Sequence, residues 1–140
     1  MMNIKNCLLR AFLQNKIVLH KRERLQRLKE MATTTTSTVS DMPRPETPDP
    51  HRLEKTLAEI ADLEQELQTD LKILSDLQAE VSDVIAPLQD AKYIHLLTER
   101  YLRFKSPKDI AEELGISERW VYKQCKEARN ALEKLDKKAV

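Results

Sequence analysis

The side chains that most often carry catalysis are scattered along this 140-residue chain. Two cysteines, Cys7 and Cys125, stand far apart, and the three histidines, His20, His51 and His95, lie in different segments. No pair of these residues has the spacing of a zinc site or of a nucleophile with its base. We therefore expect no enzyme activity, no metal site and no cofactor, and the two distant thiols fit a reducing compartment.

The most specific pattern lies between residues 106 and 132, in SPKDIAEELGISERWVYKQCKEARNAL. Ser106 followed by Pro107 predicts a helix start, because serine accepts a hydrogen bond from a free amide and proline suits the first turn. This helix is expected to end at Leu114, since Gly115 adopts a left-handed conformation at little cost. Ser117 then predicts the cap of a last helix that continues to about residue 135.

Two helices joined by such a tight turn must cross closely. Ala111 supplies the small residue that a close crossing needs, four positions before the chain's single glycine. The remaining apolar positions predict a shared inward face, and they are Ile110, Leu114, Ile116, Val121, Cys125, Ala128 and Leu132. Together these features favour a helix-turn-helix.

In a helix-turn-helix, the first turns of the second helix enter the major groove of double-stranded DNA. Arg119 suits a guanine, Glu118 suits a cytosine, and lysines more often contact phosphates. Trp120 is expected either to pack against the preceding helix or to stack at the groove edge. The predicted DNA-binding residues are Ser106, Lys108, Ser117, Glu118, Arg119, Trp120, Tyr122, Lys123 and Lys126.

The net charge of +1 hides strong segregation of charge along the chain. Residues 1–31 carry a net +6, residues 51–90 a net −7 and residues 91–140 a net +4. Such blocks favour internal pairing of the first two segments and a basic surface on the last one. A net +4 is modest for a DNA-binding domain, so dimerisation that doubles the phosphate contacts is expected.

Two long helices are predicted before the basic segment, at about residues 4–32 and 51–86. The second carries an apolar stripe with an average step of 3.5 residues, which favours a supercoiled pair of helices. Its members are Leu53, Leu57, Ile60, Leu63, Leu67, Leu71, Leu74, Leu77, Val81, Val84 and Leu88. In the first helix, Asn15 and Arg22 interrupt the corresponding seam, which indicates either incomplete burial or, at Asn15, a residue that fixes the helix register.

The expected fold is all-α. An antiparallel helical hairpin over residues 1–90, with a Thr/Pro-rich connection at 33–50, precedes a three-helix helix-turn-helix domain at 91–140, whose first helix spans about 91–104. The same apolar stripe could instead form a coiled coil between chains, and a homodimer or higher oligomer through the hairpin is expected. No run of uncharged residues is long enough to span a bilayer, and no export signal is expected.

Residues 91–135 resemble the C-terminal promoter-reading region of bacterial sigma factors. The resemblance rests on Leu97, Arg100-Tyr101-Leu102, Ile110-Ala111, Leu114-Gly115-Ile116-Ser117, Val121, Ala128 and Leu132. The whole chain resembles small phage-encoded regulators of Gram-positive hosts, of the RinA and ArpU late-activator type, through the hairpin, SDMPR at residues 40–44 and the sigma-like end. This resemblance implies sequence-specific DNA binding and activation of late phage operons in the host cytoplasm, in association with the nucleoid. Trp120 departs from the sigma pattern, in which a polar residue is usual.

Two other functions stay open at the level of sequence. A small terminase subunit, which packages phage DNA, also joins a helix-turn-helix to helical oligomerisation segments. A coiled-coil adaptor or inhibitor would instead contact a protein such as host RNA polymerase. A complete sigma factor is excluded by the length of the chain.

Overall fold

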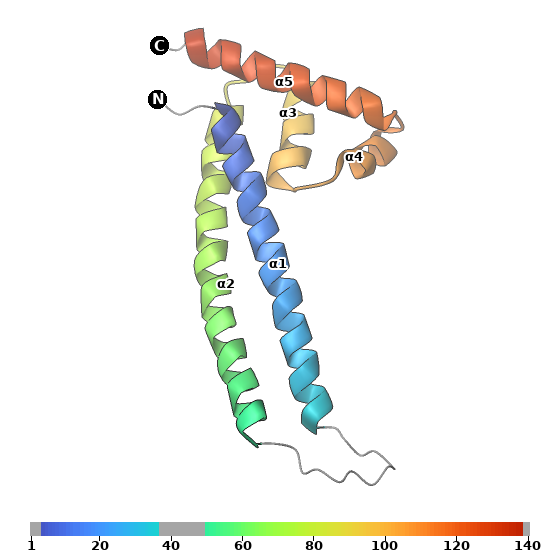
Figure 1. Ribbon diagram of the computed structural model, residues 1–140. Coiled ribbons are helices and arrows are strands. Elements are labelled where there is room, and N and C mark those ends of the chain that lie inside the picture. Colours follow the sequence, from blue (N-terminus) through green and yellow to red (C-terminus); the bar gives the residue numbers. More distant parts are fainter. Residues whose placement is uncertain (1–3, 37–49, 139–140) are drawn as a thin grey trace. The chain divides into compact units, whose positions relative to one another are not determined.

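The computed structural model describes residues 4–36 and 50–138, and all of their regular structure is helical (Figure 1). The expected all-α fold, with a helical hairpin and a helix-turn-helix domain, is therefore confirmed. Most of the predicted connection at 33–50 lies outside the described residues. The elements are α1 (Ile4–Thr36), α2 (Pro50–Ile85), α3 (Ala91–Leu97), the π-helical turn η1 (Thr98–Leu102), α4 (Pro107–Leu114) and α5 (Glu118–Lys138).

The chain divides into two compact units. The hairpin unit comprises residues 16–72, and the terminal unit, which contains both chain ends, comprises residues 1–15 and 73–140. The predicted boundary between residues 90 and 91 thus falls inside the terminal unit. No helix in the described part of the chain combines the length and the apolar character that crossing a membrane requires.

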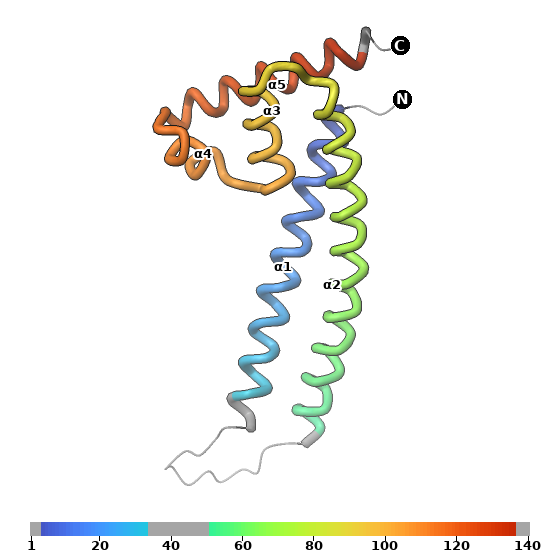
Figure 2. The backbone as a smooth tube through the Cα atoms, turned by 180° about the vertical axis from the view of Figure 1, so that it is seen from behind, coloured from blue at the N-terminus to red at the C-terminus, as the bar shows by residue number. Residues whose placement is uncertain are grey.

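Within the hairpin unit, α1 and α2 run antiparallel and meet along a seam of buried side chains (Figure 2). Val18 and Leu28 contribute to this seam from α1, while Leu63 and Leu67 contribute from α2. Salt bridges connect the same two helices. Lys21 Nζ lies 2.6 Å from Asp70 Oδ2 and 3.5 Å from Glu66 Oε2, and Lys29 Nζ lies 3.4 Å from Glu64 Oε1.

The predicted stripe is wrong at two positions. Leu57 and Leu71 are exposed (51% and 37%) and do not belong to the buried seam. A seam with alternating steps of three and four residues passes instead through their neighbours Thr56 and Asp70, which are partly buried. On α1 the same alternation selects Lys21 rather than Arg22, which is exposed. Of these polar residues, Lys21 and Asp70 pair across the seam, whereas the Thr56 hydroxyl donates to the Arg52 carbonyl at 2.9 Å within α2.

The terminal unit has a core built from segments far apart in the sequence. Leu8 and Ala11 of α1 share one buried cluster with Val81 of α2 and with Leu97 of α3. The cluster is completed by Ile4, Cys7, Leu77, Ile85, Leu88, Tyr101, Ala128 and Leu132. This mixing explains why the start of α1 and the end of α2 belong to the same unit as the helix-turn-helix.

The helix predicted at about 91–104 ends earlier than expected. The α-helix stops at Leu97 and continues as the π-helical turn η1 to Leu102. The Arg103 amide donates to the Thr98 carbonyl at 3.0 Å, the five-residue step of a π-turn. Phe104 then adopts a left-handed φ of 57°, so this residue lies outside the helix that the sequence favoured.

Candidate nucleic-acid interface

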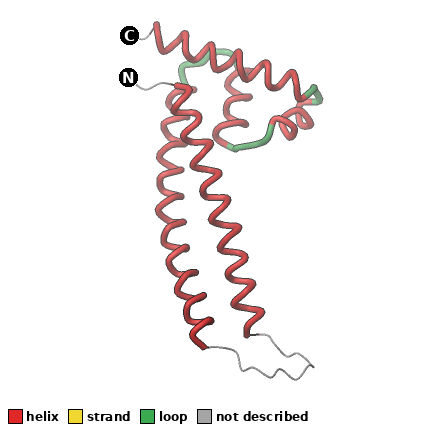
Figure 3. The backbone as a smooth tube through the Cα atoms, viewed as in Figure 1, coloured by secondary structure: helices red, strands yellow, loops and turns green. Residues whose placement is uncertain are grey.

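A short turn joins α4 to α5 (Figure 3), and the helix ends on either side have the predicted caps. The Ser106 hydroxyl accepts from the Asp109 amide at 3.1 Å, and Pro107 occupies the first turn of α4. Gly115 has φ 69°, the left-handed conformation expected of it, and the Ile116 amide donates to the Ala111 carbonyl at 3.0 Å. The Ser117 hydroxyl accepts from the Trp120 amide at 3.1 Å. Both serines therefore use their hydroxyls to start helices.

A compact apolar cluster fixes α3, α4 and α5 behind the turn. Its buried members are Leu96, Ile110, Ala111, Val121 and Cys125, with Ile116 packed against them. The expected inward face of the helix-turn-helix is therefore confirmed except at one position. Leu114 is exposed (43%), because it is the last residue of α4 and faces away from the cluster.

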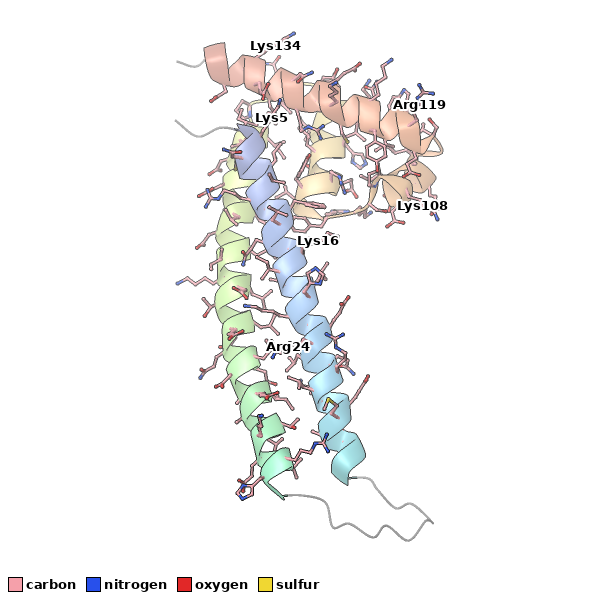
Figure 4. All side chains as sticks on the ribbon, viewed as in Figure 1. Lys5, Lys16, Arg24, Lys108, Arg119 and Lys134 are labelled. Carbon is pink, nitrogen blue, oxygen red and sulfur yellow. The ribbon has the colours of Figure 1, made fainter. Side chains whose placement is uncertain are left out.

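The opposite face of α5 is open to solvent at its start. Arg119, Lys123 and Lys126 are exposed, and 3.6 residues per turn place the three side chains along one stripe of the helix. Figure 4 shows Arg119 near the beginning of α5 and Lys108 on α4. Tyr122 (55% exposed) and Glu118 are also open, so the structure presents the predicted DNA-binding residues of α5 together, apart from the half-buried Trp120.

The cations of this face form no salt bridge with the residues that the structure describes. Within the described residues, no salt bridge involves Lys108, Arg119, Lys123 or Lys126. Acidic residues such as Glu118 lie in the same segments and offset part of this positive charge. Unpaired cations on an exposed helix face are available to phosphates and base edges.

Two arginines of the last fifty positions are engaged inside the terminal unit instead. The Arg100 guanidinium lies 4.9 Å from the Phe12 ring centroid and donates to the Lys105 carbonyl at 3.2 Å. Arg129 donates to the Tyr101 hydroxyl at 2.8 Å. These contacts engage both guanidinium groups within the terminal unit, whereas Arg119, Lys123 and Lys126 are exposed.

The segment before α4 is held by a buried carboxylate that the sequence reading missed. Glu99 is 3% exposed, and its Oε2 lies 2.8 Å from Lys105 Nζ, while its Oε1 lies 3.3 Å from Arg103. Lys105 also pairs with Glu113 of α4. The Lys105 ammonium beside the Glu99 carboxylate holds the pKa of Glu99 below its ordinary value, although burial opposes this shift. This network joins η1 to α4, and no local motif in the sequence indicates it.

The cysteines have the environment of structural residues. Cys7 and Cys125 are both buried and unpaired, and burial raises the pKa of each thiol. A raised pKa keeps a thiol protonated at neutral pH and therefore poorly nucleophilic. In the described part of the chain, no group of three or more His, Cys, Asp or Glu residues is arranged to hold a metal ion.

Comparison of the chain with protein-family models, curated proteins and solved structures gave no match.

Proposed function

We propose that this protein binds double-stranded DNA in a sequence-specific manner and regulates transcription, with the start of α5 as the reading element. The observation that carries the proposal is the two-sided character of α5. Val121 and Cys125 are buried in the core, whereas Arg119, Lys123 and Lys126 are exposed and free of salt bridges within the described residues. A helix supported from behind and cationic in front has the arrangement that major-groove reading requires.

The proposed roles follow from side-chain chemistry. Arg119 presents a fork of donors that matches the two acceptors of guanine, and Glu118 is able to accept from the cytosine amino group. Lys123 and Lys126 are assigned to phosphates, and Lys108 at the start of α4 is assigned to the DNA backbone. Ser106 and Ser117 support this surface through their caps rather than through free hydroxyls.

Within this proposal, the biological role is activation of late operons of a phage or prophage in a Gram-positive host. This assignment rests on the resemblance to late activators, and contact with host RNA polymerase is part of it. We also propose assembly of at least a dimer through the hairpin, because single-domain contacts with a modest net charge give weak electrostatic binding. Exposed apolar side chains on α1 and α2 support such assembly, including Leu13, Ile17, Met31 and Leu57.

The proposal is tested by selecting bound sequences from random duplex DNA with the full-length protein. The same selection is repeated with Arg119→Ala, with Lys123→Ala and with the control Lys134→Ala. Lys134 is an exposed lysine about 16 Å beyond Lys123 along α5. We expect Arg119→Ala to change the selected bases and Lys123→Ala to weaken binding without changing them. Each loss should be about 1–3 kcal/mol, and Lys134→Ala should leave both properties near wild type.

Failure of the wild-type protein to enrich any sequence, at low salt and at concentrations that allow dimerisation, would overturn the proposal. Enrichment that is unchanged in both the Arg119 and Lys123 variants would place the reading surface elsewhere. Sizing of the protein–DNA complex separates a dimeric regulator from a ring of eight or more subunits, which a DNA-packaging role predicts.

A further inference from the structure

The first turn of α3 meets α5 along one edge of the exposed stripe. Lys92 Nζ lies 5.3 Å from the centroid of the Trp120 ring and 5.5 Å from the centroid of the Tyr93 ring. Both distances fall within the range of a cation–π interaction. About two turns further along α5, the Tyr93 hydroxyl lies 3.5 Å from Glu127 Oε2. Aromatic faces thus hold an exposed ammonium beside the beginning of α5.

The Lys92 ammonium retains its charge for an external partner. Among the described residues, Lys92 forms no salt bridge. Asp90 caps α3 by accepting from the Lys92 backbone amide at 2.9 Å, and Glu127 faces the Tyr93 hydroxyl. The acidic groups of this corner are therefore engaged with other donors while the ammonium is positioned only by the two rings.

The size of a helix determines what this edge would face on DNA. An α-helix with its side chains is about 10–12 Å across, and the major groove is about 12 Å wide. A helix that fills the groove therefore places its outward stripe on the bases and its edges beside the sugar–phosphate backbones. Trp120 follows Arg119 by about 100° around α5, so Lys92 lies at an edge and not over the bases.

We infer that Lys92 is a phosphate-contacting residue that flanks the reading helix, and that Trp120 positions it instead of reading a base. The inference rests on the proposed DNA binding and deepens it, since it adds a contact from α3 to those of α4 and α5. It also explains why a tryptophan occupies position 120. A polar side chain there would stay hydrated and would not hold the Lys92 ammonium. The ligand group is a backbone phosphate of duplex DNA, so the contact is independent of sequence.

The test measures binding of a labelled selected duplex and of a scrambled duplex by fluorescence anisotropy across a series of KCl concentrations. The variants are Lys92→Ala, Lys92→Arg, Trp120→Leu and the double variant Lys92→Ala/Trp120→Leu. Lys72→Ala is the matched control, because Lys72 is an exposed lysine of α2 outside the terminal unit. Thermal unfolding of each variant verifies that the fold is retained.

Lys92→Ala should weaken binding to both duplexes by the same factor, about three- to tenfold at low salt. It should also lower the slope of log K against log salt by about one. Lys92→Arg should restore both quantities, and Lys72→Ala should match wild type. Trp120→Leu should weaken binding in the same uniform way in the wild-type background, with little further loss once Lys92 is already alanine.

The possible failures are distinct. If wild type binds the selected duplex but Lys92→Ala keeps the salt slope of Lys72→Ala, the inference is overturned and the proposed function stands. A change in base preference caused by Trp120→Leu would overturn the positioning role and make Trp120 a reading residue. If wild type binds neither duplex, the proposed function itself is wrong. Should Trp120→Leu fail to fold, the comparison of Lys92→Ala with Lys92→Arg still decides the phosphate contact.

Discussion

Lysine and arginine side chains are used differently in the hairpin unit and at the start of α5. In the hairpin unit, Lys21 and Lys29 pair with carboxylates of α2 and hold two helices together. In the terminal unit, Arg119 and Lys123 extend from a helix whose other face is buried, and no salt bridge among the described residues involves them. The same chemical groups hold α1 and α2 together and remain available to a ligand at the start of α5, while the terminal unit also keeps internal pairs such as Lys105 with Glu99 and Lys5 with Glu133.

This contrast shows that the location of charge is more informative than its amount. Residues 1–31 carry a higher net charge than residues 91–140, +6 against +4. An exposed salt bridge contributes little free energy, but pairing still removes a cation from the set that phosphates can neutralise. The candidate interface is therefore expected at α5 rather than at the seam that Lys21 and Lys29 stabilise.

The largest loss of stability is expected from truncating a side chain in the core of the terminal unit. Leu8 is 1% exposed, so Leu8→Ala should lower the free energy of unfolding by about 3 kcal/mol. Its neighbour Leu9 is 51% exposed, and Leu9→Ala should cost less than about 0.5 kcal/mol. Urea denaturation followed by circular dichroism measures both. Equal effects of the two substitutions would contradict the assignment of residues 1–15 to this core.

A smaller loss is expected at the turn that sets the angle of α5. Gly115→Ala places a side chain at φ 69°, which should cost about 1–2 kcal/mol of unfolding free energy. No atom lies within 4 Å of the added Cβ, so the cost is conformational and not steric. Gly115→Asn should cost less, since asparagine tolerates this region. A larger loss for Asn than for Ala, in the same urea experiment, would contradict this explanation.

A double substitution tests how much the Lys21–Asp70 salt bridge stabilises the hairpin unit. Asp70→Leu leaves the Lys21 ammonium with only its longer contact to Glu66 on this partly apolar seam, and it should lower the melting temperature. Lys21→Leu/Asp70→Leu replaces both charges by apolar groups and should recover most of the loss or exceed wild type. Calorimetry measures the three proteins. A lower melting temperature for the double variant than for Asp70→Leu would contradict this expectation. It would mean that the Lys21–Asp70 pair stabilises the hairpin unit more than two leucines do.

The smallest expected effect is a pH dependence at Glu99. Its pKa in the folded protein lies below the ordinary 4.5, so folding favours the ionised form. The associated stabilisation is present above the ordinary value and is lost as pH falls through the lower folded-state pKa. Urea midpoints measured between about pH 3 and pH 7 should therefore fall less steeply in acid for Glu99→Gln than for wild type. Parallel profiles would exclude Glu99 as a source of acid sensitivity.

Caps and turns could be predicted from the sequence because their causes are local. The Ser106 cap, the Ser117 cap and the left-handed Gly115 each depend on backbone groups within a few residues. The inward positions Ile110 and Val121 followed from helical period alone. The exposed face of α5 could be inferred by subtraction, since residues outside the inward stripe must point to solvent or to a ligand.

Features that depend on tertiary partners could not be predicted in this way. Leu71 satisfied the apolar period, but the seam passes through Asp70 because Lys21 of another helix supplies its partner. The π-turn at η1 and the burial of Glu99 depend on Lys105 folding back after the helix. The place of Lys92 over Trp120 likewise joins residues 28 positions apart in the sequence, for which no motif exists.

The central claim is that the beginning of α5, and not the hairpin, meets duplex DNA. The most direct test records amide ¹H–¹⁵N spectra of the full-length protein during titration with a selected duplex. We expect the largest amide chemical-shift changes at residues 117–126 and at Lys92 and Lys108, with small changes around Lys21 and Asp70. Strong shifts confined to residues 16–72, or none at the start of α5 when binding is saturated, would contradict it.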